Sequence, residues 1–425
     1  MPQIETFGRS ATWVVWCIFS EGVSLRIENL IKFSLFNSQI QLKLGIMIPR
    51  ILKDQLKSTL RPGRVWMLFG ARRVGKTRLV EDYLNERATE RWFRAHGEDS
   101  DVAELLSSRS AARFRQAFSS YDGFFLDEAQ SVPDAGPALK LLVDLFPHIK
   151  VIVTGSSAFR LDQLLGQPLT GRRSVHYLHP VTVNEISQWK GPTAPTGLLP
   201  DLLTYGSYPE VLLTGSPKER REYLRQLVED YLFQDILAFD QIRNARKLRD
   251  LTTLVAHQVG SELSLNELAN ALQINKGTVE RYLDLLEKSF VLFRVDGFSR
   301  NLRKEVSKTK RYYFTDNGIR NAVINQFQSL SLRPDRGCLW ENFFINERRR
   351  LLAYQQKGVR DYFWRTYDQQ EIDRIEVDPE DRIHAYECKW SPKSRRIPPA
   401  WKTAYPDAGF DFVTPENFML HLESG

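Results

Sequence analysis

The stretch 68–79 constrains the fold of this chain more than any other segment. It matches the pattern G-x-x-x-x-G-K-[ST], with the fixed positions at Gly70, Gly75, Lys76 and Thr77. An apolar run at 65–69 precedes it and predicts a buried strand, and residues 77–84 have helical spacing. Glycines let backbone N–H groups approach an anion closely, and a helix N-terminus adds its positive dipole end. This strand, loop and helix therefore predict a phosphate-binding loop.

The residue types in the loop indicate a nucleoside triphosphate with magnesium as its ligand. Lys76 is expected to reach the β- and γ-phosphates, and the Thr77 hydroxyl is expected to hold Mg²⁺. The alternative is a chance loop in an unrelated fold, but the flanking strand and helix favour nucleotide binding. We expect ATP contacts from Gly70, Ala71, Arg72, Arg73, Val74, Gly75, Lys76, Thr77 and Arg78.

A second apolar stretch, 121–128, ends in Asp127 and Glu128. This is the Walker B pattern, in which Asp127 can bind the Mg²⁺ shell and Glu128 can polarise the attacking water. Many apolar runs that end in acids are only strands entering a loop. The position of this run after a phosphate loop favours the catalytic interpretation.

Two further features suggest catalytic residues. A third apolar strand, 151–153, is followed by Thr154 and Ser156, and either hydroxyl could sense the γ-phosphate from a strand between the two Walker strands. A simple strand exit is the alternative. Arg172 could act as an arginine finger, in cis or across a subunit boundary, or could form an ordinary surface pair.

Together these motifs resemble those of bacterial and archaeal AAA-type ATPases whose C-terminal part is the domain of unknown function 4143. The resemblance extends from about Met47 to the C-terminus and includes segments 205–210, 311–318 and 340–343. It implies an α/β fold with a P-loop ASCE/AAA+ parallel sheet core, a helical lid, a winged helix-turn-helix and a C-terminal PD-(D/E)xK nuclease-like α/β domain. A homo-oligomer, such as a ring, is the assembly that the arginine finger would require.

The expected division of the chain follows from these motifs and from the local sequence pattern. Residues 192–200 are rich in proline and glycine and predict a linker or turn, and apolar residues at helical spacing after 218 resemble the AAA lid. Residues 1–46 are interpreted as an extension or an artefact of start-codon choice. The remaining expected domains are an ATPase core at 47–190, a lid and linker at 191–245, a winged helix at 246–318 and a nuclease-like domain at 319–425.

Segment 247–315 predicts a winged helix that could contact DNA. Helical patterns at 251–259, 264–272 and 278–288 precede a strand pair with a basic tip. Clustered basic residues can neutralise phosphates, although winged helices in ATPases also serve as protein-packing modules. The candidate DNA-binding residues are Asn275, Lys276, Thr278, Arg281, Arg303, Lys304, Lys308, Lys310 and Arg311.

The C-terminal segment carries a possible second chemistry. Glu387 and Lys389 are two residues apart on a predicted strand, so both project from one sheet face towards Asp373 on the neighbouring strand. Glu341, on the preceding helix, could add a ligand. Such carboxylates can hold Mg²⁺ or Mn²⁺, and Lys389 would stabilise charge at a scissile phosphate. Cross-strand pairing on a solvated face, without cleavage, is the alternative.

Composition narrows the class of protein only slightly. A chain of 425 residues should form roughly two to four domains, and its net charge of +7 weakly favours a polyanionic partner. Cys17, Cys338 and Cys388 lack metal-ligand spacing, which suits a reducing cytoplasm. The apolar patch at 11–19 is too short to span a bilayer, so no membrane partner is expected.

These patterns predict Mg²⁺-dependent ATP hydrolysis coupled to DNA binding or remodelling, with a metal-dependent nuclease as a possible activity of the tail. A different class of protein fits the same motifs. It is a nucleotide-dependent switch or scaffold whose winged helix and inactive nuclease-like tail bind protein.

Overall fold

The structure is a computed structural model that describes residues 47–156, 169–230, 244–300, 310–391 and 396–423. The chain divides into two compact units, Met1–Met47 and Ile48–Gly425. The predicted N-terminal extension at 1–46 lies outside the described residues. The architecture below is that of the second unit.

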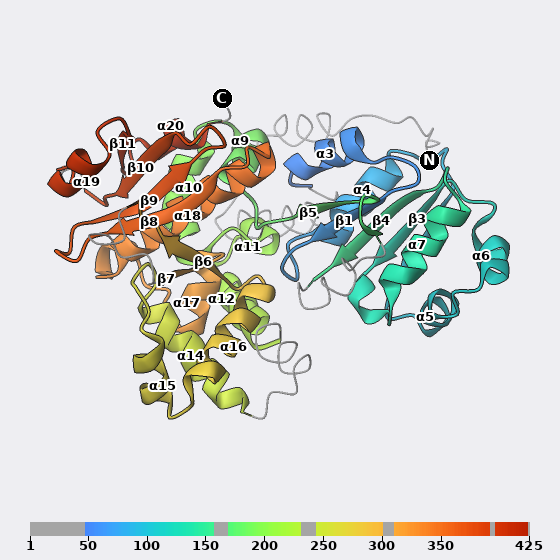
Figure 1. The fold of residues 1–425 in the computed structure, drawn as a ribbon, viewed down its shortest axis with the longest axis horizontal. Coiled ribbons are helices and arrows are strands. Elements are labelled where there is room, and N and C mark those ends of the chain that lie inside the picture. Colours follow the sequence, from blue (N-terminus) through green and yellow to red (C-terminus); the bar gives the residue numbers. More distant parts are fainter. Residues whose placement is uncertain (1–46, 157–168, 231–243, 301–309, 392–395, 424–425) are drawn as a thin grey trace, which may run out of the picture. The chain divides into compact units, whose positions relative to one another are not determined.

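A five-stranded parallel sheet forms the first part of this unit, as the sequence predicts (Figure 1). Its order is β2-β3-β4-β1-β5, and β4 pairs with both β1 and β3. The strand that carries Thr154 therefore lies between the two Walker strands. The strands are β1 (Val65–Phe69), β2 (Trp92–His96), β3 (Gly123–Asp127), β4 (Lys150–Gly155) and β5 (Arg173–Tyr177).

Helices cover both faces of this sheet, because side chains along a strand alternate between the faces. Trp66 and Leu68 of β1 belong to the apolar cluster that includes α3 and α4, whereas Val65, Met67 and Phe69 pack with α5, α6 and α7 (Figure 1). All five residues of β1 are buried. The helices are α3 (Ile51–Thr59), α4 (Lys76–Asn85), α5 (Ser100–Ser107), α6 (Ala111–Phe118) and α7 (Ala135–Leu145).

Four helices follow β5, and one of them corrects a prediction. The proline- and glycine-rich stretch 192–200, predicted as a linker or turn, lies mostly in α10 (Ala194–Tyr205). Pro195 lies in the first helical turn, where a missing N–H is tolerated, and buried Leu202 and Leu203 hold the later turns against the core. The other helices are α9 (Val183–Lys190), α11 (Pro209–Leu213) and α12 (Pro217–Leu227).

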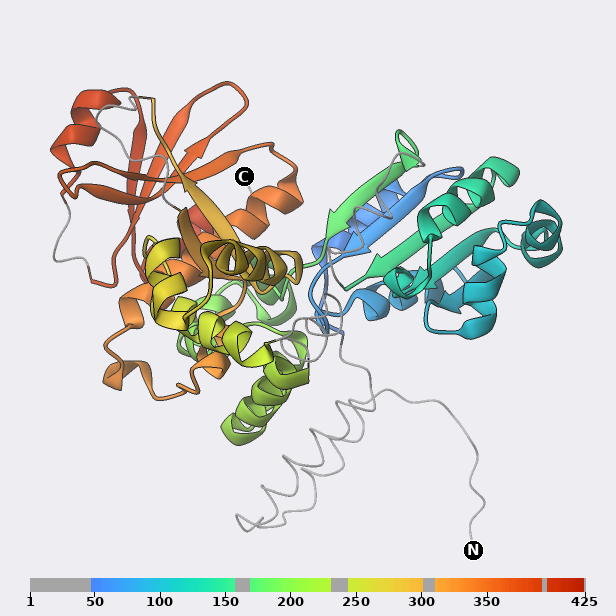
Figure 2. The same ribbon diagram turned by 60° about the horizontal axis from the view of Figure 1, so that its bottom comes forward.

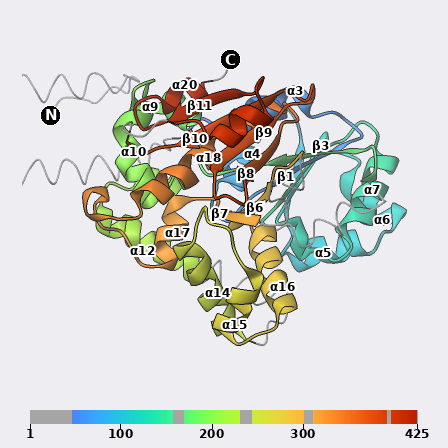
Figure 3. The same cartoon turned by 60° about the vertical axis from the view of Figure 1, so that its left-hand side comes forward.

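The segment predicted as a winged helix contains three helices and a β-hairpin. Figure 3 shows α14, α15 and α16 gathered beside the hairpin of β6 and β7. Ser264 and Asn275 cap α15 and α16 through hydrogen bonds that their side chains accept from Glu267 N and Thr278 N. The elements are α14 (Ala245–His257), α15 (Leu265–Leu272), α16 (Lys276–Lys288), β6 (Leu292–Gly297) and β7 (Lys310–Phe314).

The hairpin also belongs to a second, six-stranded sheet with the order β11-β10-β9-β8-β6-β7 (Figure 2). β6 pairs in parallel with β8 through Asp296 and Gly297. A domain boundary at residue 318 therefore passes between strands of one sheet. The remaining elements are α17 (Asn317–Val323), α18 (Arg336–Gln355), β8 (Arg360–Arg365), β9 (Glu371–Val377), β10 (Ile383–Cys388), α19 (Pro399–Ala404), β11 (Gly409–Val413) and α20 (Phe418–Leu422).

Within the described ranges, the helices are all too short or too polar to cross a bilayer.

Candidate functional site

The loop between β1 and α4 has the backbone that close approach to phosphate requires. Gly75, the N-cap of α4, has φ 97°, which disfavours any residue with a side chain. A Cβ on Gly70 would lie 2.2 Å from the Leu178 carbonyl oxygen. Both glycines are therefore required by the fold of the loop, and the loop leads into the N-terminus of α4, where an anion is favoured.

Lys76 lies inside this loop. Its Nζ donates hydrogen bonds of 3.0 Å to the carbonyl oxygens of Gly70 and Ala71, and the residue is 4% exposed. Burial lowers the pKa of Lys76 to about 8, although the carboxylates of Glu128 and Asp127 oppose that shift. A bound triphosphate would provide the negative charge that this buried ammonium group lacks.

Thr77, at the start of α4, and Asp127, at the end of β3, are in direct contact. The Thr77 hydroxyl donates to Asp127 Oδ2 at 2.7 Å, and the buried Thr154 hydroxyl donates to Asp127 Oδ1. Hydroxyl and carboxylate oxygens are hard donors of the kind that Mg²⁺ prefers. The residues present thus fit a magnesium ion at this place, and Thr154 orients the carboxylate.

Glu128 is held beside this carboxylate in an uncommon backbone conformation. Its φ is 51°, and its Oε2 accepts hydrogen bonds from Ser156 Oγ at 2.7 Å and from Gln130 Nε2. Burial raises the pKa of Glu128, but Lys76 and the two hydrogen bonds outweigh this and hold it below its ordinary value. The side chain is therefore an ionised acceptor, and Gln130 is a site residue that the sequence did not single out.

The structure distinguishes the two hydroxyls that were left as alternatives. Thr154 contacts the Asp127 carboxylate and also accepts a hydrogen bond of 3.1 Å from Glu128 N, whereas Ser156 contacts the Glu128 carboxylate. The candidate arginine finger, Arg172, forms an ion pair with Asp144 of α7 and is about half exposed. In this chain it makes a surface pair.

Arg50, which sequence analysis did not identify, links the phosphate loop to the segment after β5 and to α9. Its guanidinium donates to Val74 O in the loop at 2.7 Å, to His179 O after β5 at 2.5 Å, and to Glu185 of α9 at 3.1 Å. Glu185 is fully buried. No sequence motif marks Arg50, because its partners lie 24 to 135 residues away.

We expect Arg50→Met to destabilise the protein by about 3–5 kcal/mol, because it leaves the Glu185 carboxylate buried without its cation. ATP affinity should fall as well, since Val74 O loses its donor. Thermal or urea unfolding and ATP titration measure the two effects. Lys53→Met is the control: Lys53 pairs with Asp82 and Glu86 near the surface, so its loss should cost about 1 kcal/mol or less. Equal effects of the two variants would contradict the role given to Arg50.

Arg73, at the tip of the loop, contacts a helix of the segment predicted as a lid. Its guanidinium carbon lies 5.5 Å from the centroid of the Tyr223 ring on α12, and Nη2 lies 3.9 Å from Asp230 Oδ2. The phosphate loop is thus in direct contact with α12.

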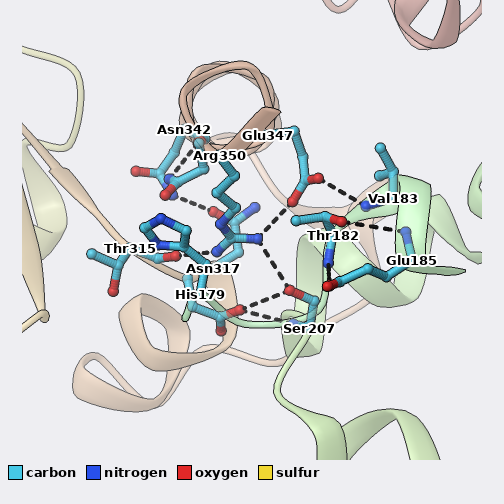
Figure 4. A network of polar contacts seen from close by, with 12 residues as sticks. His179, Thr182, Val183, Glu185, Ser207, Thr315, Asn317, Asn342, Glu347 and Arg350 are labelled. Atoms are coloured by element: carbon cyan, nitrogen blue, oxygen red, sulfur yellow. Dashed lines mark hydrogen bonds and ion pairs between the residues drawn. The ribbon is translucent and has the colours of Figure 1, made fainter. Parts of the chain in front are cut away.

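A second polar network surrounds Arg350 of α18 (Figure 4). Arg350 Nη1 donates to Glu347 Oε1 at 2.6 Å and to Ser207 Oγ at 3.3 Å, and Nη2 donates to Thr315 O. Glu347 in turn accepts from Val183 N at 2.9 Å. Segments 205–210 and 311–318, which contributed to the family resemblance, therefore supply structural contacts to α18.

The four residues predicted for a nuclease are brought together by α18, β9 and β10. Asp373 Oδ2 accepts from Cys388 N at 2.8 Å, and Lys389 Nζ donates to Glu387 Oε1 at 2.6 Å. Glu341 accepts a hydrogen bond of 2.8 Å from Tyr313 OH. However, within the described part of the chain no group of three or more His, Cys, Asp or Glu side chains is arranged to hold a metal ion. The Arg311 guanidinium, with Nη1 3.7 Å from Asp373 Oδ1 and 4.0 Å from Glu341 Oε1, lies where the predicted Mg²⁺ or Mn²⁺ would have to bind.

The carboxylates of this cluster are shifted towards their protonated forms. Burial, and the neighbouring Asp373, raise the pKa of Glu387 to about 7, against the opposing effect of Lys389. Burial likewise raises the pKa of Glu341 well above its usual range. The cluster therefore concentrates more carboxylate groups than its surroundings can keep ionised.

The predicted DNA-binding residues fall into three groups. Asn275, Lys276, Thr278 and Arg281 lie at the start of α16, where Asn275, Lys276 and Arg281 are exposed. Arg303, Lys304 and Lys308 lie outside the described residues. Lys310 is partly exposed, but Arg311 is 3% exposed and paired with Glu371, so Arg311 is not available to a phosphate and does not belong to an exposed basic wing.

Three families match successive parts of the chain. Residues 62–187 match the AAA domain, residues 196–330 match a domain of unknown function (DUF8612), and residues 336–411 match a domain of unknown function (DUF4143). The chain carries an AAA domain followed by a DUF4143 domain. The family resemblance is thereby confirmed, and the AAA domain supports a nucleotide-dependent activity.

Two relatives of this chain are described only as uncharacterized proteins. One from Mycobacterium tuberculosis is 26% identical over 340 residues, covering 79% of this chain and 72% of the relative. One from Methanocaldococcus jannaschii is 23% identical over 346 residues, covering 77% and 76%. The solved structure of AMPPCP-bound DnaA from Aquifex aeolicus aligns with 63% of this chain and 90% of its own, at 19% identity and a TM-score of 0.29. That similarity is too low to carry an inference.

Proposed function

We propose that this AAA-type protein hydrolyses ATP with Mg²⁺ and that the hydrolysis is coupled to DNA binding or remodelling. The observation that carries the ATPase part is the 2.7 Å contact between Thr77 Oγ1 and Asp127 Oδ2. It joins the hydroxyl of one motif to the carboxylate of the other, and these are the two side chains that would hold a nucleotide-bound magnesium ion. Loss of ATP turnover on removal of Mg²⁺ or of the Lys76 ammonium tests it.

In this proposal each side chain has a defined task. Lys76 leaves its two loop carbonyls and binds the β- and γ-phosphates, while Thr77 and Asp127 hold Mg²⁺, which neutralises charge on the phosphate oxygens when bound. Glu128 orients and deprotonates the attacking water. Thr154 keeps the Asp127 carboxylate in position, and Ser156 and Gln130 keep the Glu128 carboxylate in position.

Two parts of the proposal concern a conformational change in the lid and the assembly of a homo-oligomer. The contact of Arg73 with Tyr223 supports a lid role for α12, because a conformational change of the phosphate loop on nucleotide binding would alter this contact directly. Arg172 is proposed as an arginine finger in a homo-oligomer, in which it would exchange Asp144 for the nucleotide of a neighbouring subunit. Its half-exposed position supports that exchange.

DNA binding is proposed for the start of α16. Lys276 and Arg281 are both exposed and lie five residues apart on the third helix of the winged-helix segment. The net charge of +7 favours a polyanion. Neither residue is required by the apolar packing of α16, so both can be replaced without loss of the fold.

We expect Lys276→Gln/Arg281→Gln to weaken DNA binding and to reduce the slope of log K against log[salt] by about 1 for each lost phosphate contact. Binding to single-stranded, duplex and branched DNA, measured across salt concentrations with and without ATP, provides the slope. The matched control is Lys218→Gln/Lys357→Gln, which removes the same charge from exposed positions elsewhere. An unchanged slope in the α16 variant would show that α16 does not contact DNA. Binding that does not depend on salt would contradict DNA as the ligand.

A second candidate function is a nucleotide-dependent switch or scaffold whose tail binds protein and does not cleave DNA. The position of Arg311 among the tail carboxylates favours an inactive tail. A metal-dependent nuclease would instead use Glu341, Asp373, Glu387 and Lys389. Mn²⁺-dependent nicking that Glu387→Ala abolishes, with ATP turnover intact, would distinguish the nuclease from the switch.

A further inference from the structure

Four carboxyl groups of the DUF4143 segment converge on one place. Glu341 comes from α18, Glu371 and Asp373 from β9, and Glu387 from β10. Asp373 and Glu387 are buried and the Glu341 side chain is 17% exposed, and a carboxylate withdrawn from water requires a compensating positive charge or a proton. The cation that compensates this cluster determines what the cluster can do.

Arg311 of β7 enters the cluster from the hairpin of the preceding segment. Its Nη2 lies 2.6 Å from Glu371 Oε2, and its Nη1 lies 3.7 Å from Asp373 Oδ1 and 4.0 Å from Glu341 Oε1. The guanidinium carbon is 4.6 Å from the centroid of the Phe363 ring on β8. The guanidinium thus contacts three of the four carboxylates from a position fixed by an aromatic face.

We propose that the Arg311 guanidinium is the resident cation of this carboxylate cluster and that it takes the place of a divalent metal ion. This inference concerns the tail alone and does not depend on ATP hydrolysis at the phosphate loop.

The remaining hydrogen bonds of the cluster are made by the protein itself. Asp373 Oδ2 accepts from Cys388 N, Glu341 Oε1 accepts from Tyr313 OH, and Glu387 Oε1 accepts from Lys389 Nζ. Among the described side chains, only Glu387 Oε2 in this cluster of carboxylates is buried without a hydrogen-bond partner. A metal ion needs several oxygens that converge on one point, and here the Arg311 guanidinium lies where Glu341, Glu371 and Asp373 converge.

Arginine is suited to such a role because its guanidinium stays charged under all ordinary conditions and forms several fixed N–H contacts. It cannot lose its proton to become a ligand, so a divalent ion among these carboxylates would lie next to a permanent positive charge. Binding of the metal would require Arg311 to leave.

The fold explains how Arg311 comes to be there. Phe298 N donates to Phe363 O at 2.7 Å, and β6 pairs with β8 at Asp296 and Gly297, so the hairpin that carries β7 is attached to the tail sheet. In sequence, Arg311 belongs to a basic run that resembles an exposed wing. Only the pairing of β6 with β8 directs it into the cluster.

The test is Mn²⁺ binding followed by electron paramagnetic resonance, with the full chain and without nucleotide, so that the ATP site does not contribute. Wild type and Asp373→Asn should give the same titration, with no saturable site that depends on Asp373. Arg311→Met should bind Mn²⁺ at least about tenfold more tightly than wild type, because the repelling charge is gone. Arg311→Met/Asp373→Asn should lose that gain.

Arg348→Met is the matched control, because it removes a half-buried guanidinium that pairs with Glu376 of β9 outside the cluster. It should not acquire a Mn²⁺ site. The proposal is overturned if wild type binds Mn²⁺ saturably and Asp373→Asn abolishes the binding, and that comparison holds even if Arg311→Met fails to fold. It is also overturned if folded Arg311→Met gains no site, or if Arg348→Met gains the same one.

Discussion

Replacement of Lys76 by alanine is expected to lower ATP turnover by at least about 10²-fold and to weaken ATP binding. The Lys76 ammonium is buried in the loop and donates to two carbonyl oxygens that a triphosphate would replace as its partners. Its removal takes away a buried side-chain cation from the loop, so both the bound state and the transition state lose charge stabilisation. Phosphate release and titration with a fluorescent ATP analogue measure the two losses.

The control for this variant is Lys140→Ala, which removes an exposed lysine from α7 and should leave turnover unchanged. An unaltered melting temperature for Lys76→Ala would exclude unfolding as the cause. Normal turnover in a folded Lys76→Ala protein would refute the proposed site.

Glu128→Gln should separate binding from hydrolysis. Turnover is expected to fall by about 10²–10⁴-fold, because an amide cannot take the proton of the attacking water. ATP affinity should be retained, since Lys76, Thr77 and the loop glycines are unchanged. Single-turnover hydrolysis together with equilibrium binding of ATP distinguishes this result from that of Lys76→Ala, in which both quantities change.

A matched control for Glu128→Gln is Asp134→Asn. Asp134 has nearly the same backbone conformation, with φ 52°, and also follows β3, but its carboxylate pairs with Arg109 on the surface. The control should retain full activity. If Glu128→Gln hydrolyses ATP at the wild-type rate, another group activates the water and the role given to Glu128 is wrong.

Local sequence patterns identify the candidate ATP site because its motifs consist of contiguous residues. The glycine loop, the acidic pair and the apolar strands before them each occupy a few positions, and each of these strands was predicted within two residues of its observed bounds. The proline- and glycine-rich stretch 192–200 was predicted wrongly. Burial of Leu202 and Leu203 stabilises α10 there and overrides the local preference of proline for turns.

Other residues of the candidate site could not be predicted from local sequence patterns, because contacts between distant segments define them. In the sequence, nothing distinguishes Arg50 from other arginines that precede a helix. Its role follows from its hydrogen bonds to Val74, His179 and Glu185 in the folded chain. Gln130 becomes significant only because the turn after β3 directs its amide to Glu128 and Ser156. Neither residue lies in a pattern whose spacing predicts these partners.

The sequence by itself determined that a phosphate loop, a Walker B strand and a third strand exist, since each depends on near-neighbour residues and on strand and helix periodicity. The tertiary structure alone decided the complete order of the strands, the hydrogen bond from Thr77 to Asp127, and the position of Arg311 among carboxylates instead of on an exposed wing. The physical reason is that strands pair through backbone hydrogen bonds, which are the same for every residue type and therefore leave no mark in the sequence. The pairing of β4 with β1 and β3, and of β6 with β8, is of this kind.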